Sequence, residues 1–354
     1  MGLAFSIVIV TRPTRLEGLR NRWGTLGQAK FRLAASRAIA DASMDSKSAS
    51  FKSSTSKTSE SKSTGRMKSL KKKAVASGTT GQADFSDYID EDSVYKKSVE
   101  NLASELMQLG FPVKTIDRLY VSTFDFGLAS VVVVIGQDGL VANVAKYVGD
   151  VPIVAVNPDP RRIDGILLPF RVEEAVYAVS ETFKGKSKLK SLTLAEAQLN
   201  DGQRLLAFND LFIGAASHVS ARYLLSTENR SESQSSSGVI VSTGAGSTGW
   251  ISSVFNMTSG VAKFLGVHVE SPPPMPWDLR ELQWAVREPF QSRTSQVEMV
   301  AGRIRDRSEL VIESLMPDQG VIFSDGIEAD FLPFTSGSIV RIFASKQCAR
   351  LVVK

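Results

Sequence analysis

The side chains of this chain that could bind or react with a substrate occur in four short polar clusters. They are Gly136-Gln137-Asp138-Gly139, the pair Asn209-Asp210, the loop from Thr243 to Trp250, and Asp325-Gly326. A carboxylate can accept the proton of a substrate hydroxyl, and glycine lets a backbone approach a phosphate closely. Asp and Asn side chains suit the hydroxyl groups of a ribose. These residue types favour the binding and chemistry of a nucleotide.

The sequence around Asp138 predicts where its carboxylate lies. The β-branched run 131–135 is typical of a buried strand of a parallel sheet, and 140–148 has the spacing of a helix that stops at Gly149. Asp138 then lies on a strand-to-helix turn, where open α/β folds bind ligands and where helix N-termini favour phosphate. The alternative is that Asp138 merely caps the helix.

The other clusters each leave a structural alternative open. Asn209 and Asp210 interrupt an apolar strand, where they either anchor a bulge or contact a ligand. The loop 243–250 joins a strand to a helix that Ser247 and Thr248 can cap, and it lacks the lysine of a Walker-type phosphate loop. It is either a nucleotide-contacting loop or a flexible connector. Asp325-Gly326 taken alone is only a turn.

Strand and helix patterns alternate in the first half of the chain, which predicts an α/β, Rossmann-like domain with a parallel sheet. The predicted strands are 5–10, 113–116, 131–135 and 152–156, and the predicted helices are 16–40, 95–109, 140–148 and 172–183.

The second half has the alternation of β-strands and predicts a β-rich, antiparallel, sandwich-like domain. The predicted strands are 189–199, 204–213, 218–225, 238–243, 310–313, 321–324, 338–344 and 350–353, with a polar loop at 228–237 and a helix at 251–264.

The chain of 354 residues, 43% of them hydrophobic, is long enough for two domains. We expect the α/β domain to comprise 1–43 and 83–186, interrupted by a disordered Ser/Lys-rich insertion at 44–82. The β-rich domain is 187–354, with a C-terminal tail that returns towards the α/β domain. Met1-Gly2 fits an N-myristoylation pattern, but a first strand is the preferred interpretation of this segment.

Composition excludes several classes of function. The net charge of +5 is concentrated in the insertion, so a nucleic-acid partner is not expected. A single cysteine and two histidines argue against a disulfide framework and against a Cys or His metal centre, and they fit a reducing compartment, the cytoplasm. No apolar run reaches the roughly 20 residues of a transmembrane helix.

The order of the clusters between 131 and 343 resembles the NAD kinase family, part of a superfamily with the diacylglycerol kinases and phosphofructokinases. The family's Gly-Gly-Asp-Gly motif corresponds to Gly136–Gly139, with Gln137 in place of its second glycine. Its Asn-Glu or Asn-Asp pair corresponds to Asn209 and Asp210. Its Thr-Pro-Thr-Gly-Ser-Thr-Ala-Tyr loop corresponds to Thr243–Trp250, and the asparagine of a further turn corresponds to Asn157.

The resemblance implies transfer of the γ-phosphoryl group of ATP, with Mg²⁺, to the 2′-hydroxyl of the adenosine ribose of NAD, which gives NADP. Asp138 would orient this hydroxyl and accept its proton. A homodimer or tetramer is implied as well, and no protein ligands for a metal are predicted. The residues expected to bind the nucleotides are Gly136, Gln137, Gly139, Asn157, Asn209, Asp210, Thr243, Gly246, Ser247, Thr248, Trp250 and Asp325.

Gln137 leaves other functions open, because its side chain stands where the family lets backbone approach phosphate. One alternative is a sensor that binds NAD or NADP without phosphorylating it. Another is a related kinase that acts on a sugar or lipid hydroxyl, for which the Gly2 motif and the lysine run at 68–73 are the only hints.

Overall fold

The computed structural model describes residues 7–35 and 85–354. The motif at Gly2 and the predicted insertion 44–82 lie outside these residues. Contacts divide the chain into two units, one that joins the N-terminal strand to Ser98–Lys354 and one that comprises Pro13–Lys97.

The described residues of the unit Pro13–Lys97 are mostly helical. Helix α1 (Arg15–Trp23) starts with a capping box, in which Thr14 and Glu17 each accept a backbone hydrogen bond from the other. The predicted helix 16–40 is wrong in one respect, because it is interrupted at Gly24, whose φ of +78° ends α1. Residues 26–35 are again helical. Helix α3 (Phe85–Gln108), which begins in this unit, starts well before the predicted position 95.

Four parallel strands and the two-residue β5, which pairs with β4, form the sheet of the α/β part of the larger unit, and they confirm the predicted parallel sheet. The order of the four is β2-β1-β3-β4, and their β-branched side chains are buried on both faces in β1, β3 and β4. Helix α4 (Asp138–Ala145) follows β3, and α5 (Val172–Phe183) follows the short β5 (Phe170–Arg171). The strands are β1 (Ile7–Thr11), β2 (Val113–Asp117), β3 (Val131–Ile135) and β4 (Ile153–Asn157).

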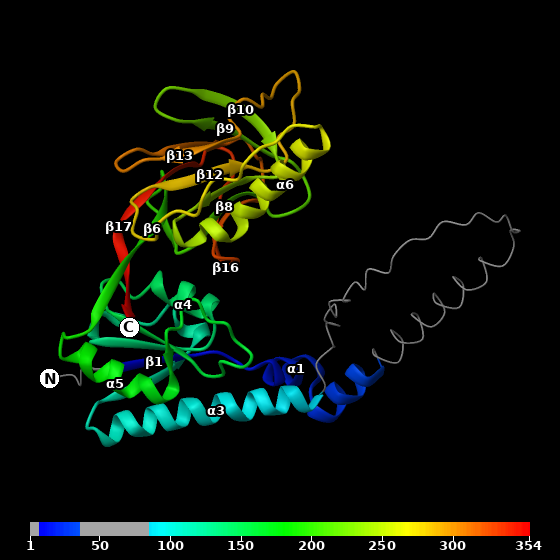
Figure 1. The fold of residues 1–354 in the computed structure, drawn as a ribbon. Helices are drawn as coiled ribbons and strands as arrows, with labels where there is room; N and C mark the ends of the chain where they lie inside the picture. Colours follow the sequence, from blue (N-terminus) through cyan, green and yellow to red (C-terminus); the bar gives the residue numbers. More distant parts are fainter. Residues whose placement is uncertain (1–6, 36–84) are drawn as a thin grey trace, which may run out of the picture. The chain divides into compact units, whose positions relative to one another are not determined.

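The second half of the chain is an antiparallel sandwich, as the sequence predicts. A six-stranded sheet has the order β13-β12-β11-β8-β15-β16. Its inner side chains share one core with strands of the other sheet, and α6 (Trp250–Phe264) packs on its outer face through Ile251 (Figure 1). The six strands are β8 (Asp210–Ala215), β11 (Val239–Ser242), β12 (Leu282–Val286), β13 (Ala301–Ile304), β15 (Gly320–Ser324) and β16 (Ile327–Pro333).

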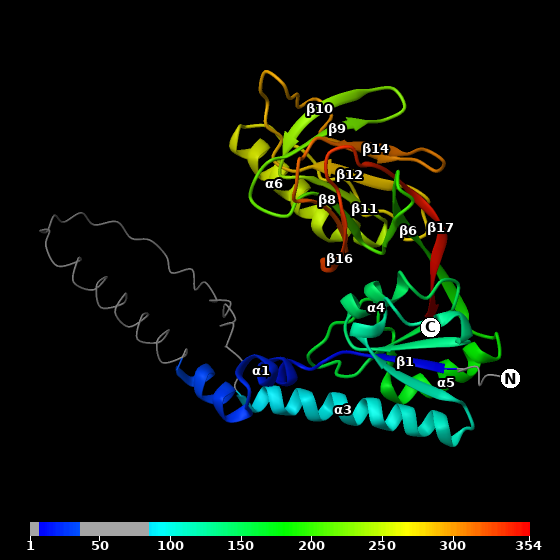
Figure 2. The same ribbon diagram turned by 180° about the vertical axis from the view of Figure 1, so that it is seen from behind.

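Two long strands, β6 (Lys188–Leu199) and β17 (Ile339–Val353), connect the α/β part to the sandwich (Figures 1 and 2). They pair with each other in antiparallel fashion along their length. Strand β17 also pairs with β14 (Leu310–Ser314) of the sandwich and, at its end, with β4 of the parallel sheet. A single sheet therefore runs through both parts. The sequence predicted two strands where the structure has β17, and a change of register between Ala344 and Cys348 lies between them.

Other predicted elements need correction. The strand predicted at 204–213 is two strands, β7 (Arg204–Ala207) and β8, because the chain bends at 208–209. The predicted polar loop 228–237 contains β10 (Ser231–Ser236), which pairs with β9 (Ala221–Ser226) and buries Glu232 and Gln234. Strands β12, β13 and β16 were not predicted. In the part of the chain that the structure describes, no helix combines the length and apolar character needed to cross a bilayer.

Candidate active site

Asp138 follows the turn after β3 and is the first residue of α4, so the helix begins two residues before the predicted position 140. The Asp138 carboxylate accepts hydrogen bonds from the backbone amides of Leu167 (2.8 Å) and Ile166 (3.2 Å). Gln137 is exposed, precedes α4 and makes no side-chain cap. The carboxylate therefore ties the start of α4 to the loop that follows β4, and its position is fixed by two donors.

Asn157 supports the same loop from the end of β4. Its side-chain amide donates to the carbonyl of Ile163 (2.9 Å), and its Oδ1 accepts from the backbone of Asp159 (3.1 Å). Gly165 lies so close that a Cβ there would be 2.8 Å from Asn157 Nδ2. Asn157 is 5% exposed. Its polar atoms are engaged within the protein, so its contribution to the site is to shape the loop that holds Asp138.

Asp325 is the centre of a second cluster, at the turn between β15 and β16. Its carboxylate accepts from three consecutive backbone amides, those of Phe208 (3.0 Å), Asn209 (2.6 Å) and Asp210 (3.3 Å). Burial raises the pKa of the Asp325 carboxyl, and Lys146 and the three amides act in the opposite direction. Asp325 has a φ of +53°, and its side chain is 2% exposed. This turn therefore fixes the backbone on which Asn209 and Asp210 stand.

Asp210 is the most unusual group of the site. Its residue is 9% exposed, and its Oδ1 has no hydrogen-bond partner within the described residues. Burial, together with the charge of Asp325, raises the pKa of the Asp210 carboxyl to about 7, although a hydrogen-bonding contribution from Ser242 opposes the rise. Buried polar atoms are normally paired. An unpaired buried oxygen therefore costs the folded protein free energy unless a donor from outside the chain pairs with it.

The loop after β11 packs tightly against this cluster. Thr243 Oγ1 donates to the carbonyl of Phe208 (2.6 Å) and accepts from the amide of Gly246 (3.2 Å). Ser247 Oγ donates to the carbonyl of Gly244 (2.7 Å). A Cβ at Gly244 or Gly246 would lie 2.0 or 2.3 Å from a backbone oxygen. The loop is therefore closely packed and supports the backbone of residues 208–209.

The start of α6 differs from the prediction. Residues Ala245–Thr248 form a 3₁₀ turn, and the N-cap of α6 is Gly249, without a side-chain hydrogen bond. Ser247 and Thr248 therefore do not cap the helix, because the 3₁₀ turn separates them from it. Thr248 is exposed. Gly249 brings the backbone close to Asp210, since a Cβ at Gly249 would lie 3.8 Å from Asp210 Oδ2.

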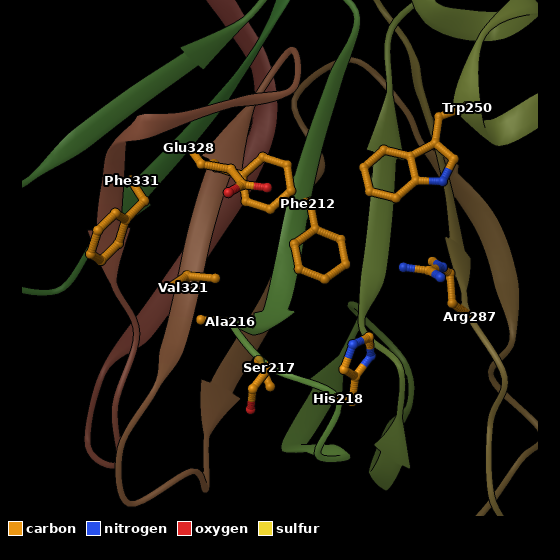
Figure 3. A pocket seen from close by; sticks show the side chains of 11 residues that line it. Phe212, Ala216, Ser217, His218, Trp250, Arg287, Val321, Glu328 and Phe331 are labelled. Carbon is orange, nitrogen blue, oxygen red and sulfur yellow. The ribbon is translucent and has the colours of Figure 1, made fainter. Parts of the chain in front are cut away.

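A pocket of about 470 Å³ lies on the outer face of the six-stranded sheet. Figure 3 shows Phe212 at its middle, with Trp250 and Arg287 on one side and Phe331 on the other. The rings of Phe212 and Trp250 are stacked at 5.6 Å and 12°, and the Arg287 guanidinium lies 5.4 Å from the Trp250 ring centroid. Such walls suit a flat ring with an anionic substituent.

Eight of the predicted residues thus fall into two groups. Asn209, Asp210, Thr243, Gly246, Ser247 and Asp325 form one cluster, and Asp138 and Asn157 meet at the loop after β4. Sequence reasoning missed the pocket residues Phe212, Phe323 and Arg287 and the buried Lys146. Phe212 lies two residues after Asp210 on β8, so strand alternation could have found it, whereas Asp325 lies in the turn after β15 and does not point to Phe323 in this way.

Similarity to known proteins is found among solved structures. No protein-family model matches the chain, and no curated protein matches its sequence. Among solved structures, the chain is similar to yeast NADH kinase in complex with NADH, with a TM-score of 0.48 and 16% identity over 69% of this chain and 67% of that one.

Proposed function

We propose that this chain transfers the γ-phosphoryl group of ATP to a ribose hydroxyl of a dinucleotide, in the manner of an NAD kinase acting on the 2′-hydroxyl of NAD. The observation that carries this proposal is the buried Oδ1 of Asp210, which lacks a partner within the described residues. A buried acceptor left unpaired costs free energy. A ligand hydroxyl would satisfy it.

The surroundings of Asp210 favour a nucleoside as the source of this hydroxyl. Asp210 and Phe212 lie on the same face of β8, and Trp250 follows Gly249, which is beside the Asp210 carboxylate. A ligand that reaches both the carboxylate and the stacked rings needs hydroxyl groups next to a flat ring system. Asn209, whose backbone Asp325 holds, can bind further ribose hydroxyls.

Asp138 is the proposed catalytic base. The ribose oxygen attacks the γ-phosphorus, its proton passes to the Asp138 carboxylate, and the bond from phosphorus to the bridging oxygen of ATP breaks to release ADP. Each carboxylate oxygen has more than one lone pair, so Asp138 can keep its bonds to Ile166 and Leu167 and still accept from the hydroxyl. The N-terminus of α4 and Gly139 can lie against the phosphates.

Magnesium enters the proposal with the nucleotide. Among residues 7–35 and 85–354, no group of three or more His, Cys, Asp or Glu side chains could hold a metal ion. The residues that the structure describes therefore do not fit a magnesium site built by the protein alone. Mg²⁺ typically keeps several waters and binds substrate phosphates, so it belongs to the Mg–ATP substrate in this proposal.

The test is formation of NADP⁺ from NAD⁺ with ATP and Mg²⁺ by the parent and by Asp138→Asn. We expect turnover in the parent and a fall in kcat of about 10²–10⁴-fold in the variant. The matched control is Asp164→Asn, which changes an exposed aspartate in the loop that binds Asp138. Equal kcat values for the parent and Asp138→Asn would contradict the role of Asp138.

A sensor that binds a dinucleotide without reaction is the second candidate. It is favoured by the engagement of both Asp138 oxygens with backbone amides and by the exposed Gln137 at the turn. A sensor would bind NAD⁺, NADH or NADPH in calorimetry and form no phosphorylated product with any donor. In either case we propose that the protein is a homo-oligomer, as the family resemblance implies. We also propose a cytoplasmic location, because a single cysteine, Cys348, fits a reducing compartment.

A further inference from the structure

Lys146 is a buried cation that the proposed reaction does not use. It follows the last residue of α4, and its side chain is 1% exposed. Its Nζ donates to Ser324 Oγ (2.8 Å) and lies 3.8 Å from Asp325 Oδ2 and 3.8 Å from Asp330 Oδ2. Burial of a lysine is costly unless it is paired. The buried Lys146 is therefore stabilised by Asp325 and Asp330, and the question is what the charge of Lys146 does for these two acids.

The contacts of Asp325 show what this charge does. The carboxylate that Lys146 approaches is the one that accepts from the amides of Phe208, Asn209 and Asp210. The amide of Asp325 in turn donates to the carbonyl of Asp210 (2.9 Å). A positive charge beside Asp325 favours its ionised form, which is the stronger acceptor for these amides. Lys146 thus acts on the backbone of residues 208–210 through Asp325.

Helix α4 connects this effect to the proposed base. Asp138 starts the helix and Lys146 follows its end, so that about 12 Å of helix separates the two residues. The Asp138 end lies at the parallel sheet, and the Lys146 end contacts the turn between β15 and β16 of the sandwich. The helix is therefore the physical link between Asp138 and the pair Asn209-Asp210.

We propose that Lys146 is a positioning residue, which holds Asp325 and thereby sets the orientation of Asn209 and Asp210 relative to Asp138. The proposal rests on the proposed function for its effect on catalysis, but its effect on the backbone of residues 208–210 does not depend on any activity.

The backbone effect is tested by hydrogen exchange of the free protein, measured by mass spectrometry on peptides that cover 206–212. In Lys146→Met, we expect the amides of Phe208, Asn209 and Asp210 to exchange at least about tenfold faster, because the charge that supports their acceptor is lost. Peptides from β3 and β11 should exchange as in the parent. Lys146→Arg keeps the charge and should restore most of the protection.

Two further variants distinguish a positioning role of Lys146 from the general effect of losing a positive charge and from a failure to fold. Lys184→Met removes an exposed lysine paired with Glu181 and should change nothing in the 206–212 peptide. Lys146→Met with Asp330→Asn restores the local charge balance but still removes the cation from Asp325. It should show the same loss of protection, and it replaces Lys146→Met if that variant does not fold.

The kinetic readout completes the test. In Lys146→Met, we expect the KM for the dinucleotide to rise at least about tenfold while kcat changes less, because the substitution affects Asn209 and Asp210 more than Asp138. A parent without turnover, together with the exchange effect, would overturn the proposed function and leave the positioning role intact. Unchanged exchange at 206–212, or a uniform increase over the whole chain, would overturn the positioning role.

Discussion

Asp210 is buried although one of its oxygens has no partner in the described structure, and this arrangement has a measurable cost. Its carboxyl pKa rises from the usual 3.8 to about 7, so the folded protein binds a proton there more tightly than the unfolded chain. The stability that this proton provides is present below about pH 4 and is lost as the pH rises to about 7. The sign is the opposite of that for an aspartate in a salt bridge.

Replacement of Asp210 by Asn should therefore stabilise the protein above neutral pH. We expect Asp210→Asn to exceed the parent in free energy of unfolding by about 2–4 kcal/mol at pH 8, with the difference disappearing towards pH 4. Urea unfolding at several pH values measures this difference. The same variant should bind NAD⁺ more weakly in calorimetry. A difference that does not change with pH would contradict the raised pKa, and Asp164→Asn serves as the exposed control.

Single residues also mark the limit of prediction from the sequence. The polar pair in an apolar strand indicated Asp210, because buried polar residues need a partner, whereas Asp325 taken alone predicted only a turn and was named through the family resemblance. Their partners are a tertiary feature, and no local spacing connects Asp325 to the amides of residues 208–210. Lys146 was missed for a related reason, since a lone lysine at the end of an apolar helix normally faces solvent.

Among the structural elements, two contain glycines that differ in the space around them. They are the loop from Thr243 to Gly249, where a Cβ does not fit, and the start of α4, where it does. A Cβ at Gly244 would lie 2.0 Å from the carbonyl oxygen of Pro276, whereas a Cβ at Gly139 would meet no heavy atom within 4 Å. The first glycine is therefore required by packing. The second lies in a helix, where glycine is a poor residue, and packing within the protein does not require it.

Alanine at these two positions should separate packing from ligand approach. We expect Gly244→Ala to lower the free energy of unfolding by roughly 3 kcal/mol or more, since a backbone must shift. Gly139→Ala should raise it by up to about 1 kcal/mol. If phosphate approaches α4 closely, Gly139→Ala should also raise the KM for ATP. Urea unfolding and ATP titrations measure these effects, and an unchanged KM would argue against phosphate at Gly139.

The elements that the sequence predicted best are those whose pattern is local. The bounds of β3 and α5 agree with the predicted ranges, because an unbroken β-branched run and a regular helical spacing need no partner to be recognised. Strand β10 was missed because its Ser-rich composition is typical of a loop. It is a strand because β9 pairs with it and because Glu232 accepts from the amides of Glu298 and Met299.

At the scale of the whole molecule, the shared strands β6 and β17 couple the parallel sheet to the sandwich. Strand β17 contacts strands of both parts, and it lies against β6 over most of its length. Neither part can lose these strands without losing a strand of its own sheet. We therefore expect both parts to unfold together.

This expectation can be tested with tryptophans in the two cores. Trp284 is buried in the sandwich core, and Trp277 packs against the core of the α/β part. One variant should keep Trp284 as its single tryptophan and another should keep Trp277. Both should give the same urea midpoint by fluorescence, and far-UV circular dichroism should give that midpoint too. Separate midpoints would show that β6 and β17 do not couple the two parts.

The place of β17 in the sequence also matters for how the protein is made. It is the last strand of the described chain, yet its partners β4, β6 and β14 are all translated earlier. While the ribosome is still synthesising residues beyond β14, each of these strands has an edge whose backbone N–H and C=O groups are unpaired. The edges of β4, β6 and β14 therefore stay unpaired until β17 has been synthesised. We expect slow translation of this last segment to increase aggregation of the nascent chain, while the folded protein stays unchanged.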